Sequence, residues 1–350
     1  MKGFLVGAIL TAGIAILAAP ARADDFWKST PAKPGGAVVM KVVMVEDLDG
    51  DPVAAGRKAA RQLKAAMAGA PLKAVVVSEV FEDREFKQKL LDGITSEIDE
   101  DLVLGGATYG SFTHDGCTDF DAVALLGIGG QGVGVTAGLV TEQGAAKLQV
   151  GQDDAAIKQR LDAAGKRLAK GLARSDQDKL LILVADAHSP KNQHLVEGVQ
   201  AVLGKRFPIT GGSANKNAGQ TFVYFRGKAH QDASVGVLLS GNFGVALAGR
   251  KATDNDAVVA TARDGAAEAM KKAQGKPLAV LAFNCAGRRS RLAEYGDELE
   301  AIEDAIGKNV PLFGLYCAGE IGPVDLSEKQ SDALSGGSGW HVMFSVLWAK

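Results

Sequence analysis

The chain has 350 residues, of which 47% are hydrophobic, and its formal net charge is −2. A mildly acidic chain without a basic run offers no electrostatic footprint for nucleic acid or for an anionic membrane surface. With only three cysteines, the protein is not a disulfide-built scaffold. The length exceeds that of a usual single domain, but it suits one large unit that is assembled from repeats.

The first 23 residues have the pattern of a secretory signal peptide. Lys2 supplies a positive start, an apolar run covers residues 4–17, and the small-x-small stretch 21–23 offers a cleavage site. The apolar run is short for a membrane span of about 20 residues, which favours cleavage over an uncleaved anchor helix. We therefore expect export, either to a periplasm or out of the cell, with a mature chain that begins at Asp24 and is not attached to a membrane.

Residues 24–36 are polar and predict a flexible lead-in, after which one pattern occurs three times at a spacing of about 100 residues. Each copy has an Ala-rich helical stretch, a short apolar strand, a second helical stretch and an apolar strand that ends in glycine. The first helical stretches are 51–68, 153–172 and 254–272, and each begins with an aspartate suited to N-capping. The second helical stretches are 82–97, 191–203 and 295–306, and the flanking strands are 74–77 and 102–105, 180–184 and 207–211, and 278–283 and 310–314.

Strand, helix and strand in this order are typical of a right-handed βαβ crossover. Two glycine-rich stretches, 121–139 and 232–249, resemble each other and predict β-hairpins. The sequence therefore predicts an α/β fold of three similar repeated βαβ units, with mainly parallel sheets and added β-hairpins. Residues 37–250 would hold two units and residues 251–350 the third.

Familiar cofactor and nucleophile motifs lack their structural context. The stretch 127–132 fits G-x-G-x-x-G, but β-like residues follow where a dinucleotide site needs a helix. The acidic stretch from Asp47 fits half of a calcium loop, but Lys58 stands where the loop needs a bidentate glutamate. No G-x-S-x-G elbow occurs. We expect no cofactor, and only His188, which follows a strand, is placed where a ligand or metal site would lie.

The most informative motifs follow the two strands of the third unit. Arg288 ends the stretch NCAGR (284–288), and Glu320 ends the stretch YCAGE (316–320). The carboxyl ends of parallel strands are the usual place of ligand crevices. Arginine can hold a carboxylate through two hydrogen bonds and glutamate can accept from an ammonium group, so the pair suits a small zwitterion such as an amino acid. The alternative is that Arg288 and Glu320 only pair with each other.

Glycines and small polar residues at the corresponding strand ends would complete a cradle of backbone amides around this ligand. The predicted ligand-binding residues are Gly105, Thr108, Gly211, Gly212, Ser213, Asn215, Cys285, Arg288, Tyr316, Cys317, Gly319 and Glu320.

Cys285 and Cys317 follow two strands that the pattern places side by side. Neighbouring strands can bring them within the Cα separation of roughly 4.4–6.8 Å that a disulfide needs. Two buried thiols and a catalytic thiol are the alternatives, and a catalytic thiol would require a base that no nearby residue supplies in the sequence.

These motifs make the chain similar to the FIST family, a sensory domain of bacterial signal-transduction proteins. Residues 278–323, with AVLAFNCAGR and PLFGLYCAGEIGP, resemble the FIST C region, and LVLGGATYGS, LLILVAD and FPITGGSAN resemble strand-end motifs of the FIST N region. On this resemblance, residues 37–250 are FIST N-like and residues 251–350 are FIST C-like. The first unit has Ser111 where the third has Glu320, so charged recognition would be lost there.

The resemblance implies a receptor-like domain that binds a small ligand such as an amino acid, without catalysis, and that signals through a separate protein. We therefore expect an exported FIST-type sensory protein that is not an enzyme. Three alternatives stay open: a haem- or metal-binding sensor that uses His188, an enzyme that uses Cys285 or Cys317, and a structural envelope protein.

Overall fold

The structure is a computed structural model that describes residues 24–350 except positions 48, 119, 218–219, 326 and 329–331. The predicted signal peptide, residues 1–23, lies outside the described residues. In the part of the chain that the structure describes, no helix is both long and apolar enough to cross a membrane.

Three units follow one another along the chain, and each contributes four main strands and two long helices in the same order. The first unit has β2 (Val39–Glu46), α1 (Pro52–Ala66), β3 (Leu72–Glu79), α2 (Arg84–Thr95), β4 (Val103–Ala107) and β7 (Ala122–Gly129). The second unit has β8 (Val133–Val140), α3 (Asp154–Gly171), β9 (Asp178–Ala185), α4 (Asn192–Leu203), β10 (Ile209–Ser213) and β15 (Ser234–Gly241). The third unit has β16 (Phe243–Lys251), α5 (Asn255–Lys272), β17 (Pro277–Cys285), α7 (Tyr295–Ile306), β18 (Leu312–Cys317) and β21 (His341–Ala349).

Short elements fill the connections between these strands and helices. They are β1 (Asp25–Lys28), a 3-10 helix η1 (Glu100–Leu102), β5 (Ser111–Thr113), β6 (Gly116–Cys117), β11 (Lys216–Asn217), β12 (Gln220–Thr221), β13 (Val223–Phe225), β14 (Lys228–His230), α6 (Ala286–Arg289), β19 (Glu320–Gly322) and β20 (Gly336–Ser338).

The local signals of the helices act largely as expected. Asp51 caps α1 by accepting a hydrogen bond from the Ala54 amide, and Asp254 caps α5 in the same way. Asp153 makes no such bond at the start of α3. Since a capping side chain satisfies an amide that the first turn leaves unpaired, two of the three predicted caps are confirmed.

The strand order is the same in the three sheets: β4-β3-β7-β2, β10-β9-β15-β8 and β18-β17-β21-β16. In each sheet the first two strands are parallel and are joined through a helix, as a βαβ crossover requires. Every other neighbour in these orders is antiparallel. The prediction of an α/β fold is confirmed, but the prediction of mainly parallel sheets is wrong, because each unit's last strand returns between two strands that run the opposite way.

The two predicted β-hairpins are also absent from the described structure. Strands β7 and β8 belong to different sheets, and so do β15 and β16. Each apparent hairpin is therefore the step from one unit to the next. The first strand of the third unit along the chain is therefore β16, which starts at Phe243.

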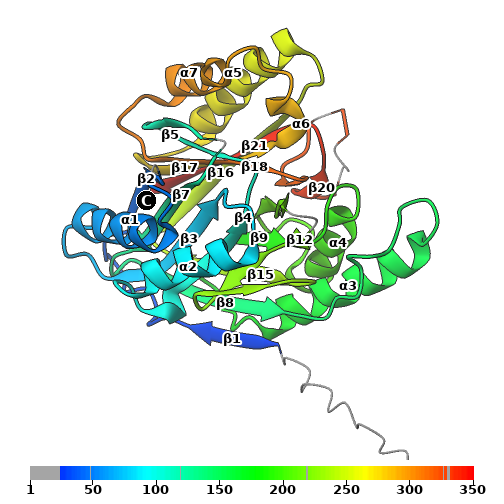
Figure 1. Cartoon of the computed structure of the whole chain (residues 1–350), viewed down its shortest axis with the longest axis horizontal. Coiled ribbons are helices and arrows are strands. Elements are labelled where there is room, and N and C mark those ends of the chain that lie inside the picture. The colour runs from blue at the N-terminus through cyan, green and yellow to red at the C-terminus, as the bar shows by residue number, and fades with distance from the viewer. Residues whose placement is uncertain (1–23, 48, 119, 218–219, 326, 329–331) are drawn as a thin grey trace, which may run out of the picture.

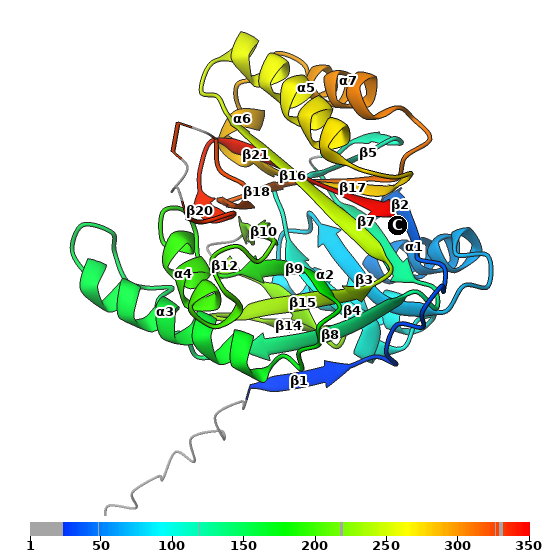
Figure 2. The same cartoon turned by 180° about the vertical axis from the view of Figure 1, so that it is seen from behind.

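Each sheet is completed by a strand from another unit. Strand β13 of the second unit pairs with β4, β19 of the third unit pairs with β10, and β5 of the first unit pairs with β18. The three exchanges close a ring, so no unit has a complete sheet of its own. In Figures 1 and 2 the helices of each unit lie outside its own sheet, and the three sheets face one another.

The inner faces of the three sheets form a central apolar core, which includes Leu126, Ile182 and Phe283. Three further cores lie between each sheet and its two helices. Successive side chains of a strand point to opposite faces, so Val76 of β3 enters the central core while Val75 enters the outer one. Strands buried on both faces explain the continuous apolar runs in the sequence.

The outer core of the first unit contains a fully buried ion pair. The ammonium group of Lys87 lies 3.0 Å from Glu79 Oε1, and both side chains are 0% exposed. The hydroxyl of Tyr224, from strand β13 of the second unit, donates to the same carboxylate. This charge network therefore fixes the exchanged strand to the sheet that it completes.

Replacing Lys87 with methionine should lower the free energy of unfolding by about 3–5 kcal/mol, because Glu79 would keep a buried charge without its cation. Arg61→Met is the control, since it removes a solvent-exposed pair with Glu97 and should lower the free energy of unfolding far less. Urea unfolding of both variants measures the difference. Equal, small losses would show that the buried pair is not required for stability.

Candidate ligand pocket at the end of strand β9

A polar pocket of about 800 Å³ opens beyond the carboxyl end of β9. Its size lies within the range of about 300–1,000 Å³ that is usual for small-molecule sites. All of its walls come from the second unit. The residues that line it are Ala146, Lys147, Leu148, Gln149, Asp186, His188, Ser189, Lys191, Gln220, Thr221, Gln231 and Asp232.

Two carboxylates stand together on one wall of this pocket. Asp186 follows β9 directly, and its Oδ2 accepts from the Asp232 amide at 2.9 Å. Burial raises the pKa of Asp186, and this hydrogen bond opposes part of the shift. Asp232 Oδ2 accepts from the Gly144 amide, whereas its Oδ1 is buried and has no hydrogen-bond partner among the described residues. A buried oxygen of this kind is an acceptor to which a ligand can donate.

Nitrogen groups lie around the same pocket. His188 Nε2 lies 2.9 Å from the carbonyl oxygen of Ala214, to which it donates, and 3.3 Å from the hydroxyl oxygen of Thr221. Lys191, just before α4, donates to the carbonyls of Ala145 and Leu148 and so holds the facing segment in place.

His188 lines the pocket, as its position after a strand predicted, but none of the twelve predicted ligand-binding residues does. Ser213 and Asn215 lie beneath it, where Ser213 Oγ donates to the Ala187 carbonyl and Asn215 Nδ2 donates to the Thr108 carbonyl. Gly105 and Gly211 are paired residues inside β4 and β10. These residues therefore join the units to one another and do not face the pocket.

Arg288 lies in the outer core of the third unit and is 0% exposed. Its guanidinium donates to Glu298 Oε1 at 2.8 Å, to Asn284 Oδ1, to Thr261 Oγ1 and to the Val258 carbonyl. The hydroxyl of Tyr316 donates to Glu298 as well. The predicted role of Arg288 as the carboxylate-binding residue does not agree with this geometry, because internal acceptors occupy the guanidinium. Its partner is Glu298, not the Glu320 that the alternative named.

Glu320 is buried beside the two thiols of the third unit. Cys285 and Cys317 are register partners at the ends of β17 and β18, and both are free thiols in this structure. Glu320 Oε2 accepts from the His341 amide at 3.0 Å, whereas its Oε1 is buried and has no hydrogen-bond partner among the described residues. Burial raises the pKa of Glu320 to about 8. At neutral pH this carboxyl group is therefore mostly protonated, which does not suit the predicted role as an anion for an ammonium group.

The remaining predicted residues surround the same buried cluster. A side chain at Gly212 would overlap the sulfur of Cys317, and one at Gly319 would press on Ser189, which lines the pocket. The fold therefore brings Cys285, Cys317, Gly212, Gly319 and Glu320 together, but in a closed space behind the pocket wall. The pocket carboxylates Asp186 and Asp232 were missed, although the stretch Asp186-Ala187-His188 after a strand could have indicated the first of them.

Among the described residues, no group of three or more His, Cys, Asp or Glu side chains is arranged to hold a metal ion.

The buried carboxyl group of Glu320 predicts a pH-dependent stability. Its pKa is about 8 in the folded state and lies near 4.5 when unperturbed, so its contribution is complete below about pH 4.5 and is lost as pH rises through 8. Relative to Glu320→Gln, the unchanged protein should lose up to about 1.4 kcal/mol per pH unit in this window. Urea unfolding at several pH values measures this. The exposed variant Glu300→Gln should follow the unchanged protein, and a Glu320→Gln curve of the same shape would contradict the assignment.

No curated protein matches the chain at a significant level. Among solved structures, a cyanuric acid hydrolase from A. caulinodans has 11% identity and a TM-score of 0.42, with 90% of this chain and 99% of that chain covered. T. maritima PurL complexed with FGAR also has 11% identity, with a TM-score of 0.29 and coverage of 90% of this chain and 73% of that chain. Likenesses this weak carry no argument about function.

The protein-family models give a definite result. The model of the FIST N domain matches residues 74–267, and the model of the FIST C domain matches residues 246–323. The two matches overlap at residues 246–267 and together span most of the chain, which confirms the resemblance found in the strand-end motifs. The chain belongs to the FIST family of sensory domains of signal-transduction proteins.

Proposed function

We propose that this FIST protein is an exported sensory protein that binds a small zwitterion, such as an amino acid, in the pocket at the end of β9. The proposal depends on one observation: Asp232 lines a pocket large enough for such a ligand, and its buried Oδ1 has no partner among the described residues. An ammonium group would supply the donor that this oxygen lacks, and Asp186 would provide a second acceptor next to it.

The ligand carboxylate would lie toward the nitrogen groups of the pocket. Lys147 is exposed at the rim and forms no ion pair among the described residues. Lys191 adds a second positive charge next to the start of α4, where the helix dipole also favours an anion. Charges of both signs line this one pocket, so it favours a ligand that carries both over a simple cation or a simple anion.

The pocket is also connected to the third unit, which gives binding a route to a signal. The Ser189 amide donates to the Ala318 carbonyl, and Asn192 Nδ2 donates to the carbonyls of Glu320 and Ser338. A ligand that shifts segment 186–192 would therefore move residues of the FIST C region. We propose that a separate signalling protein reads this change.

Binding without catalysis fits the chemistry of the thiols better than a cysteine-dependent enzyme does. Burial raises the pKa of Cys285 to about 12 and raises that of Cys317 well above its usual value. The thiolate is the reactive form of cysteine, so both groups are held in the unreactive form.

Amino acids at about 100 times their dissociation constant should stabilise the protein by ~2.7 kcal/mol and raise its thermal midpoint. Asp232→Asn removes the charge from the ammonium acceptor but keeps an oxygen for the Gly144 amide, so it should lower affinity about tenfold or more. Titration calorimetry with the ligand found in the thermal screen measures the loss.

Asp176→Asn is the matched control, because Asp176 is an exposed aspartate of the same unit that lies outside the pocket. It should leave the affinity unchanged. Equal affinities of the two variants would refute the role of Asp232, and a screen in which no amino acid raises the midpoint would refute the ligand class.

A further inference from the structure

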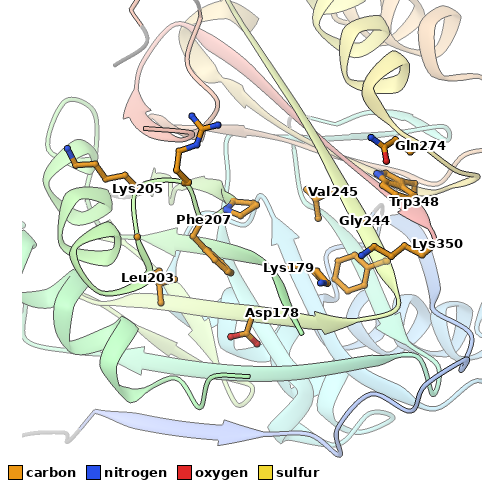
Figure 3. Close-up of a pocket in the computed structure, with 14 residues that line it drawn as sticks. Asp178, Lys179, Leu203, Lys205, Phe207, Gly244, Val245, Gln274, Trp348 and Lys350 are labelled. Carbon is orange, nitrogen blue, oxygen red and sulfur yellow. The ribbon is translucent and has the colours of Figure 1, made fainter. Parts of the chain in front are cut away.

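A second cleft, of about 600 Å³, lies at the amino end of β9. Its walls come from two units: the start of β9 and the connection from α4 to β10 on one side, and the start of β16 with the end of β21 on the other (Figure 3). We propose that this cleft is a second binding site, distinct from the zwitterion pocket, and that it takes a small amphipathic anion of the aromatic carboxylate class.

Aromatic and aliphatic side chains supply the apolar part of this site. Phe207 of the second unit and Trp348 of the third lie on opposite sides of the cleft in Figure 3. The indole of Trp348 lies against the backbone of Gly244 and Gly275, where a Cβ would overlap its ring. Because glycines at these positions leave room for the ring, Trp348 is fixed in place as an apolar wall of the cleft.

The charges around the cleft favour an anion. Lys179, Arg206 and Lys350 line it, and none of them forms an ion pair with the described residues. Its one aspartate, Asp178, accepts hydrogen bonds from Arg174 Nε and from the Ser175 hydroxyl, so its charge is already compensated.

Lys179 is the decisive cation because it is partly buried at the start of β9. In Figure 3, Lys179 lies between Phe207 and Lys350, and Lys350 lies near Trp348, so a carboxylate on a ring bound in the cleft can reach a positive charge.

The two sites are far enough apart to bind independently. Lys179 stands at the start of β9 and Asp186 just beyond its end, and a strand of this length spans about 25 Å. Helix α4 runs along the same path, from Asn192 beside the pocket to Leu203 in the cleft. A carboxylate in the cleft would thus contact neither Asp232 nor His188.

Titration calorimetry of the purified protein with 2-naphthoate tests this proposal. We expect one molecule bound per chain, and 2-naphthylmethanol, which has the same ring and no charge, should bind at least about tenfold more weakly. Lys179→Gln should weaken 2-naphthoate about tenfold, and added salt should weaken it as well. Lys41→Gln, an exposed lysine on β2, is the matched control and should have no effect.

The variant Asp232→Asn separates this site from the zwitterion pocket. It should leave 2-naphthoate binding unchanged, whether or not the protein binds an amino acid. Loss of 2-naphthoate binding in Asp232→Asn with full binding in Lys179→Gln would place the compound in the other pocket and overturn the proposal. Absence of binding, or equal binding of the acid and the alcohol, would overturn it as well. Thermal midpoints of the variants verify that each one is folded.

Discussion

The exchange of backbone hydrogen bonds among the three sheets is the constraint on which the rest of the structure depends. Strands β13, β19 and β5 each complete the sheet of another unit. Without them, one edge of β4, of β10 and of β18 would be unpaired. Unpaired backbone groups are costly when buried, so each junction requires the unit that supplies its strand. Since the exchange is cyclic, removing one junction opens the ring, and the three units must fold as one body.

This constraint also explains the glycines that mark the strand ends. Gly105 and Gly211 have φ values of +140° and +151°, a backbone conformation that other residues rarely adopt. A side chain at either position would overlap the carbonyl oxygen of the neighbouring parallel strand, at Val77 or Leu183. These glycines thus permit the close approach of the two parallel strands within a unit. They resemble a ligand cradle because both arrangements need the backbone to approach another group closely.

Local features were predictable from the sequence, whereas features that depend on contacts between units were not. Helices, apolar strands, the Asp51 cap and the three βαβ crossovers follow from periodicity and capping residues. The pairing of β7 and β8 with different sheets does not, because both are apolar strands separated by a short glycine-rich turn, which is also the pattern of a hairpin. The same holds for Arg288: its partner Glu298 lies on a different helix, and no spacing rule connects them.

The candidate pocket lies at the end of a strand that no exchanged strand pairs with, because β9 lies between β10 and β15. Strands from other units pair with the edges of β4, β10 and β18, and Ser213, Asn215 and Glu320, which lie at these junctions, are buried. The end of β9 continues instead into segment 186–192, which lies against the third unit through Ser189 and Asn192. This segment of the second unit lines the open pocket through Ser189 and is also hydrogen-bonded to the third unit. For a sensory domain this combination matters, because a ligand changes an equilibrium only through contacts that differ between two arrangements of the protein.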